Sequence, residues 1–209
     1  MRCVIIAGSP DTDIDFIKKT VSNDDYLICA DRGLFFAQKA GLKPDLIVGD
    51  FDSYKGKLPK ECEIISLNSH KDDTDTMHAI DAAFERGYTD FLLLGATGGR
   101  IDHTFSNISA LMYISKRGGR GSILSRNEFI RFLPEGVYKF DGLKGLTFSV
   151  FPFGCESVAV SYKGAEYPLD NYRLTADVPM GISNVFISDK SEIKINDGNA
   201  IIILNFSAV

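Results

Sequence analysis

Acidic residues that follow predicted strands are the part of this sequence most suited to chemistry. Asp50 and Asp52 stand two apart in the stretch Gly-Asp-Phe-Asp-Ser, directly after a short apolar run at 46–48. Side chains two residues apart in an extended segment point the same way, so both carboxylates can converge on one point. Two close carboxylates repel unless a cation lies between them, and Mg²⁺ prefers oxygen ligands of this kind together with substrate phosphates. The pair predicts a magnesium site, with a solvated Asx turn as the simpler alternative.

A second acidic group surrounds Thr74. Asp72, Asp73 and Asp75 stand just before a predicted helix at 76–86. N-capping and compensation of the helix dipole account for one aspartate at this position and leave the others unexplained. A metal ion or its bound waters would explain the surplus.

A glycine-rich loop at 95–102 links a predicted strand at 91–94 to a long amphipathic helix at 102–117. Its glycines let backbone N–H groups approach an anion, and the helix that follows adds its positive end. Arg100 supplies a fork for phosphate oxygens. The spacing fits neither of the two common nucleotide-binding fingerprints, so an ordinary strand–helix turn with a surface arginine stays open as the alternative.

Short apolar strands alternate with helical patterns through the first part of the chain. We expect strands at 3–7, 26–30, 46–48, 64–66 and 91–94, and helices at 13–21, 34–40, 76–86 and 102–117. This alternation predicts a Rossmann-like α/β domain with a mostly parallel sheet. Ligands of such sheets bind beyond the carboxyl ends of the strands, where the acidic and glycine-rich segments lie.

The pattern changes after about residue 126. Short strands without intervening helices are expected at 129–133, 137–140, 146–151, 158–162, 184–188, 192–195 and 200–206. Such spacing predicts an antiparallel β-sandwich or barrel. We therefore expect two domains, an α/β domain at 1–126 and a β domain at 127–209.

Composition excludes several classes of protein. A formal net charge of −5 argues against nucleic-acid binding, which needs clustered lysine and arginine. The longest apolar runs are too short to span a bilayer, and the first apolar stretch reads as a buried strand rather than a signal peptide, so the cytoplasm is expected. The four cysteines have no zinc-like spacing and predict no disulfide framework.

Taken together and in order, these segments resemble the thiamine pyrophosphokinase family. The matching stretches are Ala30-Asp31-Arg32-Gly33, Gly49-Asp50-Phe51-Asp52-Ser53, Asp72 and Asp75 around Thr74, Gly98-Gly99-Arg100-Ile101-Asp102-His103, and Gly181-Ile182-Ser183-Asn184. Two positions depart from the pattern. Arg32 stands where many relatives carry a small residue, and Lys71 stands where some have a neutral amide.

The resemblance implies an Mg²⁺-dependent enzyme that transfers the pyrophosphoryl group of ATP to the hydroxyl of thiamine. It also implies a catalytic domain at 1–126, a thiamine-binding domain at 127–209, and a homodimer. The active site would lie between the catalytic domain of one subunit and the β domain of the other.

The resemblance also implies roles for individual residues. The expected metal ligands are Asp50, Asp52, Asp72 and Asp75. Contacts with ATP or its phosphates are expected from Asp31, Arg32, Lys71, Thr74, Gly98, Gly99 and Arg100. Thiamine contacts are expected from Ser183 and Asn184. The expected catalytic residues are Asp50, Asp52, Asp75, Arg100 and Asp102.

Two other functions fit parts of the pattern. A phosphohydrolase of the DxDx[ST] type would use Asp50 as covalent nucleophile and Asp52 as acid, but that motif is expected after the first strand rather than the third. A protein that binds ATP or thiamine without turnover would not need so many carboxylates at strand ends. Thiamine-dependent release of AMP separates the three functions.

Overall fold

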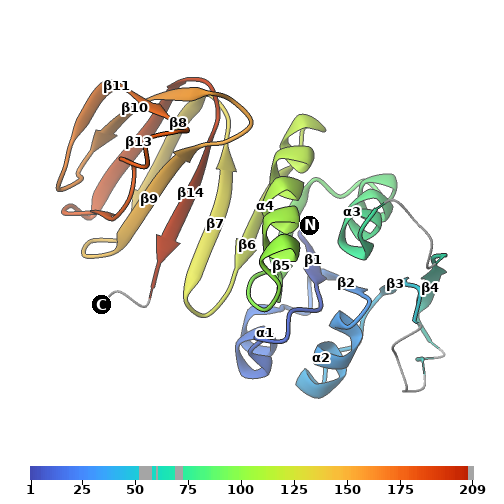
Figure 1. Ribbon diagram of the computed structural model, residues 1–209. Coiled ribbons are helices and arrows are strands. Elements are labelled where there is room, and N and C mark those ends of the chain that lie inside the picture. Colours follow the sequence, from blue (N-terminus) through green and yellow to red (C-terminus); the bar gives the residue numbers. More distant parts are fainter. Residues whose placement is uncertain (52–57, 60, 69–72, 207–209) are drawn as a thin grey trace. The chain divides into compact units, whose positions relative to one another are not determined.

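The computed structural model describes residues 1–51, 58–59, 61–68 and 73–206. The chain divides into two compact units, Met1–Arg126 and Asn127–Val209 (Figure 1). Among the residues that the structure describes, no helix is both long enough and apolar enough to cross a membrane.

The first unit is built on a parallel sheet. Its strands are β1 (Cys3–Ile6), β2 (Tyr26–Ala30), β3 (Leu46–Gly49), β4 (Glu63–Ser66), β5 (Asp90–Leu94) and β6 (Arg120–Leu124). They lie in the order β6-β5-β1-β2-β3-β4, and each neighbouring pair is parallel. All residues of β1 and β3 are buried, as expected for central strands covered on both faces.

In the part of this unit that the structure describes, the helices that cover the sheet are α1 (Ile14–Thr20), α2 (Gly33–Ala40), α3 (Asp75–Glu85) and α4 (Ile101–Lys116). The chain winds from β1 through β2 to β3 in one direction and from β4 through β5 to β6 in the other. Because crossover connections are right-handed, α1 and α2 lie on one face and α3 and α4 on the opposite face (Figure 1). The direction of winding reverses between β1 and β5, which is where such folds form a ligand crevice.

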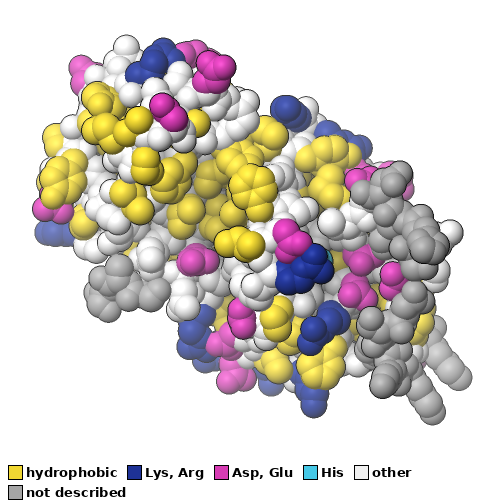
Figure 2. All heavy atoms as spheres, in the orientation of Figure 1, with side chains coloured by type: hydrophobic (Ala, Val, Ile, Leu, Met, Phe, Trp, Pro, Cys, Tyr) yellow, Lys and Arg dark blue, Asp and Glu magenta, His cyan; other side chains and the backbone are white. Residues whose placement is uncertain are grey.

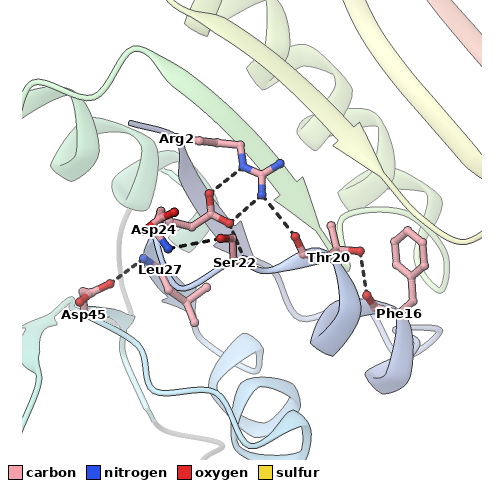
Figure 3. A network of polar contacts seen from close by, with 8 residues as sticks. Arg2, Phe16, Thr20, Ser22, Asp24, Leu27 and Asp45 are labelled. Atoms are coloured by element: carbon pink, nitrogen blue, oxygen red, sulfur yellow. Dashed lines mark hydrogen bonds and ion pairs between the residues drawn. The ribbon is translucent and has the colours of Figure 1, made fainter.

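A polar network joins the amino ends of the central strands (Figure 3). The Arg2 guanidinium donates to both carboxylate oxygens of Asp25 over 2.8 and 2.6 Å and to the carbonyl oxygen of Thr20 over 3.3 Å. Asp45 accepts a hydrogen bond from the Leu27 N–H over 2.8 Å. These bonds hold the central strands together at their amino ends, opposite to the carboxyl ends of the strands.

The second unit is an antiparallel β-sandwich. Its strands are β7 (Glu128–Leu133), β8 (Gly136–Asp141), β9 (Thr147–Pro152), β10 (Ser157–Lys163), β11 (Leu169–Thr175), β12 (Asn184–Val185), β13 (Lys190–Asp197) and β14 (Ala200–Asn205). One set pairs in the order β12-β9-β14-β7 and the other in the order β11-β10-β13-β8. Both contribute to one core, in which the rings of Phe148 and Phe186 stack with centroids 4.3 Å apart.

The predicted fold class is confirmed, with differences in particular elements. The sequence did not predict β6 or β11, and the strand expected at 184–188 is only the two-residue β12. β6 begins at Arg120, directly after glycines that signal the end of a helix. β11 is mostly exposed, so its sequence lacks the alternation of apolar and polar residues on which strand prediction depends.

Candidate functional site

A pocket of about 490 Å³ lies at the carboxyl ends of the strands of the first unit. The pocket is lined by 7–10 after β1, 30–32 at the end of β2, and 74–76 at the start of α3. The rest of its lining comes from the loop at 95–100 and from His103, Ser106 and Asn107 of α4. The volume is in the range of small-molecule sites. Because the loops after β1 and β5 both line it, the pocket lies at the reversal point of the sheet.

Most predicted site residues of the first unit meet in this pocket. Those that line it are Asp31, Arg32, Thr74, Asp75, Gly98, Gly99 and Arg100. Asp50 directly follows β3, the strand next to β2, and does not line the pocket; nor does Asp102. Asp52, Lys71 and Asp72 lie outside the described residues.

The segment after β2 has an unusual backbone. Asp31 has a φ of 45°, a conformation that non-glycine residues seldom adopt. Two residues later, a Cβ added to Gly33 would lie 1.9 Å from the Ile6 carbonyl oxygen, so α2 begins in direct contact with β1. A strained aspartate at a pocket wall is the kind of feature that concentrates at functional sites.

Thr74 is the N-cap of α3. Its hydroxyl oxygen accepts a hydrogen bond from the Met77 N–H over 3.3 Å, and the helix begins at Asp75. Asp75 therefore stands in the first helical turn, where the helix dipole favours a negative charge. The cap holds both residues at the pocket wall.

The loop at 95–100 is fixed by side chains and backbone around it. The Ser9 N–H donates to the Gly95 carbonyl oxygen over 3.0 Å, and the buried Asn107 amide donates to the Ala96 carbonyl oxygen over 2.8 Å. The Gly99 N–H donates to the Asp11 carboxylate over 2.7 Å. The segment at 7–11 was not predicted to be part of the site, although it follows the first strand and obeys the same strand-end rule.

Arg100 and Asp102 form an exposed ion pair at the start of α4. The Arg100 guanidinium donates from Nε to Asp102 Oδ1 over 3.1 Å and from Nη2 to Oδ2 over 2.5 Å. This hydrogen bonding holds the pKa of the Asp102 carboxyl below its ordinary value. Asp102 thus orients the guanidinium that lines the pocket.

The oxygen ligands near the pocket are of the type that Mg²⁺ uses. Asp31 and Asp75 line the wall, and Asp50 stands at the end of the strand beside β2. Within the described ranges, no three histidine, cysteine, aspartate or glutamate side chains gather into a cluster that could hold a metal alone. Mg²⁺ commonly takes one or two carboxylates and completes its shell with water and phosphate oxygens, so this donor set fits it.

In the second unit, the side chain of Asn184 is buried and braces the backbone of Tyr167. Its Oδ1 accepts from the N–H groups of Tyr167 (3.1 Å) and Val185 (2.9 Å), and its Nδ2 donates to the Tyr167 carbonyl oxygen over 2.8 Å. Both acceptor positions of Oδ1 are therefore filled by backbone N–H groups. Ser183 is exposed, has a φ of 59°, and donates its N–H to Ser149 Oγ over 3.0 Å.

Comparison with known families identifies both parts of the chain. Residues 17–120 match the family model described as thiamin pyrophosphokinase, catalytic domain. Residues 137–201 match the model described as thiamin pyrophosphokinase, vitamin B1 binding domain.

Individual relatives agree over nearly the whole length. The thiamine pyrophosphokinase of Bacillus subtilis is 28% identical over 205 residues, which cover 95% of this chain and 96% of the relative. Its crystal structure superposes with a TM-score of 0.85, covering 98% of this chain and 99% of that one. The crystal structure of thiamin pyrophosphokinase from Geobacillus thermodenitrificans superposes with a TM-score of 0.84 at 28% identity, covering 100% and 99%.

Proposed function

Because this chain belongs to the thiamine pyrophosphokinase family, we propose how its own residues transfer the pyrophosphoryl group of ATP to thiamine. The products are thiamine diphosphate and AMP. One observation carries the account: acidic groups, an arginine and the amino end of α4 line a single pocket of the first unit.

The polyphosphate of ATP binds along the glycine loop, which comprises residues 95–100. The amino end of α4 provides a positive electrostatic field, and Arg100 gives a planar fork to the phosphate oxygens. Asp102 keeps that fork oriented through the ion pair. Arg32, which lines the same pocket, and Lys71 add positive charge.

Asp50, Asp52, Asp72 and Asp75 would supply the carboxylates that hold Mg²⁺, and the bound ion would offset the negative charge of the phosphates. Asp31 lines the pocket at the end of β2, the strand next to β3 and Asp50.

The transfer moves one group between two oxygens. The hydroxyl oxygen of thiamine forms a bond to the β-phosphorus of ATP, and the bond from that phosphorus to the oxygen shared with the α-phosphate breaks. AMP leaves with the electron pair. The hydroxyl proton passes to a carboxylate of the pocket or to water, and Arg100 stabilises the negative charge that develops on the phosphate oxygens.

The second unit supplies thiamine contacts through Ser183 and through the segment that Asn184 braces. In the proposed homodimer it serves the catalytic unit of the partner subunit.

Hydrophobic side chains are exposed on the surface of the second unit (Figure 2); the large ones are Val137, Tyr167, Tyr172, Val178, Met180, Ile182, Ile187 and Phe206. In the first unit, Ile101 and Phe105 are exposed one turn apart on α4, next to the pocket. Exposed apolar groups of this size favour contact with another protein surface.

The dimer and the compartment have separate support. Light scattering that gives twice the mass of one chain would support the dimer, whereas the mass of one chain would contradict it.

We expect the enzyme in the cytoplasm because all four cysteines are free thiols, which is typical of proteins from reducing compartments.

ATP labelled with ³²P at the γ-phosphate tests the reaction. In pyrophosphoryl transfer the label moves to thiamine diphosphate, and AMP forms in equal amount. Label in inorganic phosphate would indicate the phosphohydrolase, and label that stays in ATP would indicate a protein that only binds its ligands.

A further inference from the structure

The loop after β1 holds the glycine loop through one carboxylate. Asp11 Oδ2 accepts the Gly99 N–H over 2.7 Å, although the two residues are 88 positions apart in the chain. The proposed function gives Asp11 no role. Gly99 immediately precedes Arg100, so any group that fixes the Gly99 backbone also fixes the start of α4.

Asp11 is itself held in place. The Thr12 hydroxyl donates to the Ser9 carbonyl oxygen over 2.6 Å, and the Ser9 N–H donates to the Gly95 carbonyl oxygen over 3.0 Å. The segment at 9–12 is therefore a small folded turn attached to the first residue of the glycine loop. Its carboxylate reaches the far end of the same loop.

The two loops also fit together by shape. A Cβ added to Gly98 would lie 2.4 Å from Asp11 Oδ2, and a Cβ added to Gly99 would lie 2.6 Å from the Pro10 ring. Both glycines have positive φ, at 93° and 61°. Glycines here serve the close approach of the segment at 10–11 as well as the turn itself.

Two consecutive glycines are the most costly residues to order, because glycine loses more conformational freedom than any other residue. If the loop were not ordered before ATP arrives, part of the binding free energy would be spent on ordering it. A hydrogen bond from an N–H to a carboxylate is among the stronger hydrogen bonds of proteins. The Asp11–Gly99 bond is suited to ordering this loop in advance.

We propose that Asp11 is a positioning residue for ATP: its carboxylate holds the Gly99 N–H and so keeps Arg100 and the amino end of α4 in the geometry that receives the phosphates. The opposite role would be competition, in which the carboxylate occupies an anion site and must leave. The fixed turn at 9–12 favours positioning. This inference rests on the proposed site for ATP phosphates.

Steady-state kinetics of Asp11→Ala and Asp11→Asn separate these roles. Asparagine keeps a carbonyl oxygen that accepts the hydrogen bond and removes only the charge. We expect Asp11→Ala to raise KM for ATP by about 3- to 10-fold, the worth of one hydrogen bond, and to leave KM for thiamine unchanged. Asp11→Asn is expected to have a KM for ATP between those of Asp11→Ala and the wild-type enzyme, because its neutral carbonyl oxygen accepts a weaker hydrogen bond.

Asp15→Ala is the matched control, because it removes an exposed carboxylate from the first turn of α1, four residues along the chain. It should leave KM for ATP unchanged. An unchanged or lower KM for ATP in Asp11→Ala would overturn positioning, and so would equal impairment of Asp11→Asn and Asp11→Ala.

A measurement without turnover covers the case in which a variant folds poorly. Positioning predicts slow hydrogen exchange of the Gly99 amide in the wild-type chain without ligand, and rapid exchange there contradicts it. Failure of the proposed function has a different signature, since the wild-type enzyme itself would then form no AMP in response to thiamine.

Discussion

The Asp31 N–H donates a hydrogen bond to the Val48 carbonyl oxygen over 2.8 Å. This bond ties the residue after β2 to Val48, the penultimate residue of β3, which stands two residues before Asp50. A Cβ added to Gly49 would lie 3.2 Å from the Asp31 Cα, so the two strand ends are packed closely. The acidic ends of two neighbouring strands are thereby fixed at one edge of the sheet.

Asp50→Asn is expected to lower kcat by about 10²-fold or more, because it removes a proposed metal ligand and the charge that holds the ion. Thermal unfolding should be nearly unchanged, since Asp50 is only half-buried. The matched control is Asp24→Asn, an exposed carboxylate in the turn before β2, which should keep full activity. Near-normal turnover by Asp50→Asn would refute its role as a metal ligand.

Replacement of Arg100 tests whether its guanidinium binds phosphate oxygens through two hydrogen bonds. Arg100→Ala should lower kcat/KM for ATP by about 10²-fold, and Arg100→Lys should recover only part of this loss, because a lysine restores the charge without the planar pair of donors. Asp102→Asn should have a smaller effect than Arg100→Ala, since it removes only the partner that orients the guanidinium. Full recovery by lysine would contradict a bidentate contact with phosphate.

Asp25→Asn should destabilise the first unit in a pH-dependent way. Burial alone would raise the pKa of the Asp25 carboxyl, but hydrogen bonds from Arg2 and the Ser22 N–H outweigh burial, and the pKa in the folded protein is lowered. A lowered folded pKa stabilises the protein above the unfolded pKa of about 3.9, and this contribution disappears as the pH falls through the folded value.

Urea unfolding at two pH values measures this effect. At pH 7 the wild-type chain should exceed Asp25→Asn in unfolding free energy by about 1–3 kcal/mol, and the difference should shrink toward about pH 3. Asp24→Asn, one residue away and exposed, should match the wild-type chain at both pH values. A difference that does not change with pH would show that the charge of Asp25 contributes nothing.

Gly33→Ala tests the contact between α2 and β1. The added methyl group would lie 1.9 Å from the Ile6 carbonyl oxygen, so backbone must shift, and overpacking of this kind costs about 1–3 kcal/mol or more. Gly41→Ala is the control: its site has a φ of 73° and open space, so only backbone strain of about 1 kcal/mol is expected. Differential scanning calorimetry should show the larger loss of Tm in Gly33→Ala; an equal or larger loss in Gly41→Ala would contradict the packing.

Sequence patterns predicted the fold well where apolar residues alternate with clear turns. Every strand and helix expected before residue 100 is present. The strands β1, β2, β3 and β5 were predictable because each contains a continuous apolar run that is buried in the sheet. β11 escaped prediction because its exposed residues Asp170, Asn171, Tyr172 and Arg173 carry no burial pattern.

The site was only partly predictable for a different reason. Asp31, Asp75 and Arg100 stand at strand or helix ends, and the strand-end rule found them. Asp11 reaches Gly99 across 88 positions, and its contact depends on the packing of two loops that no local pattern encodes. Asn184 was predicted to contact thiamine. In the structure its side chain bonds to the Tyr167 backbone, and this contact depends on tertiary packing that local sequence does not specify.

The decisive measurement is formation of AMP by the purified chain with Mg²⁺ and ATP, with and without thiamine and with and without EDTA. If the chain transfers pyrophosphate from ATP to thiamine, AMP forms only when thiamine and Mg²⁺ are both present, in equal amount to thiamine diphosphate. AMP that forms without thiamine, or phosphate release that ignores thiamine, would contradict it.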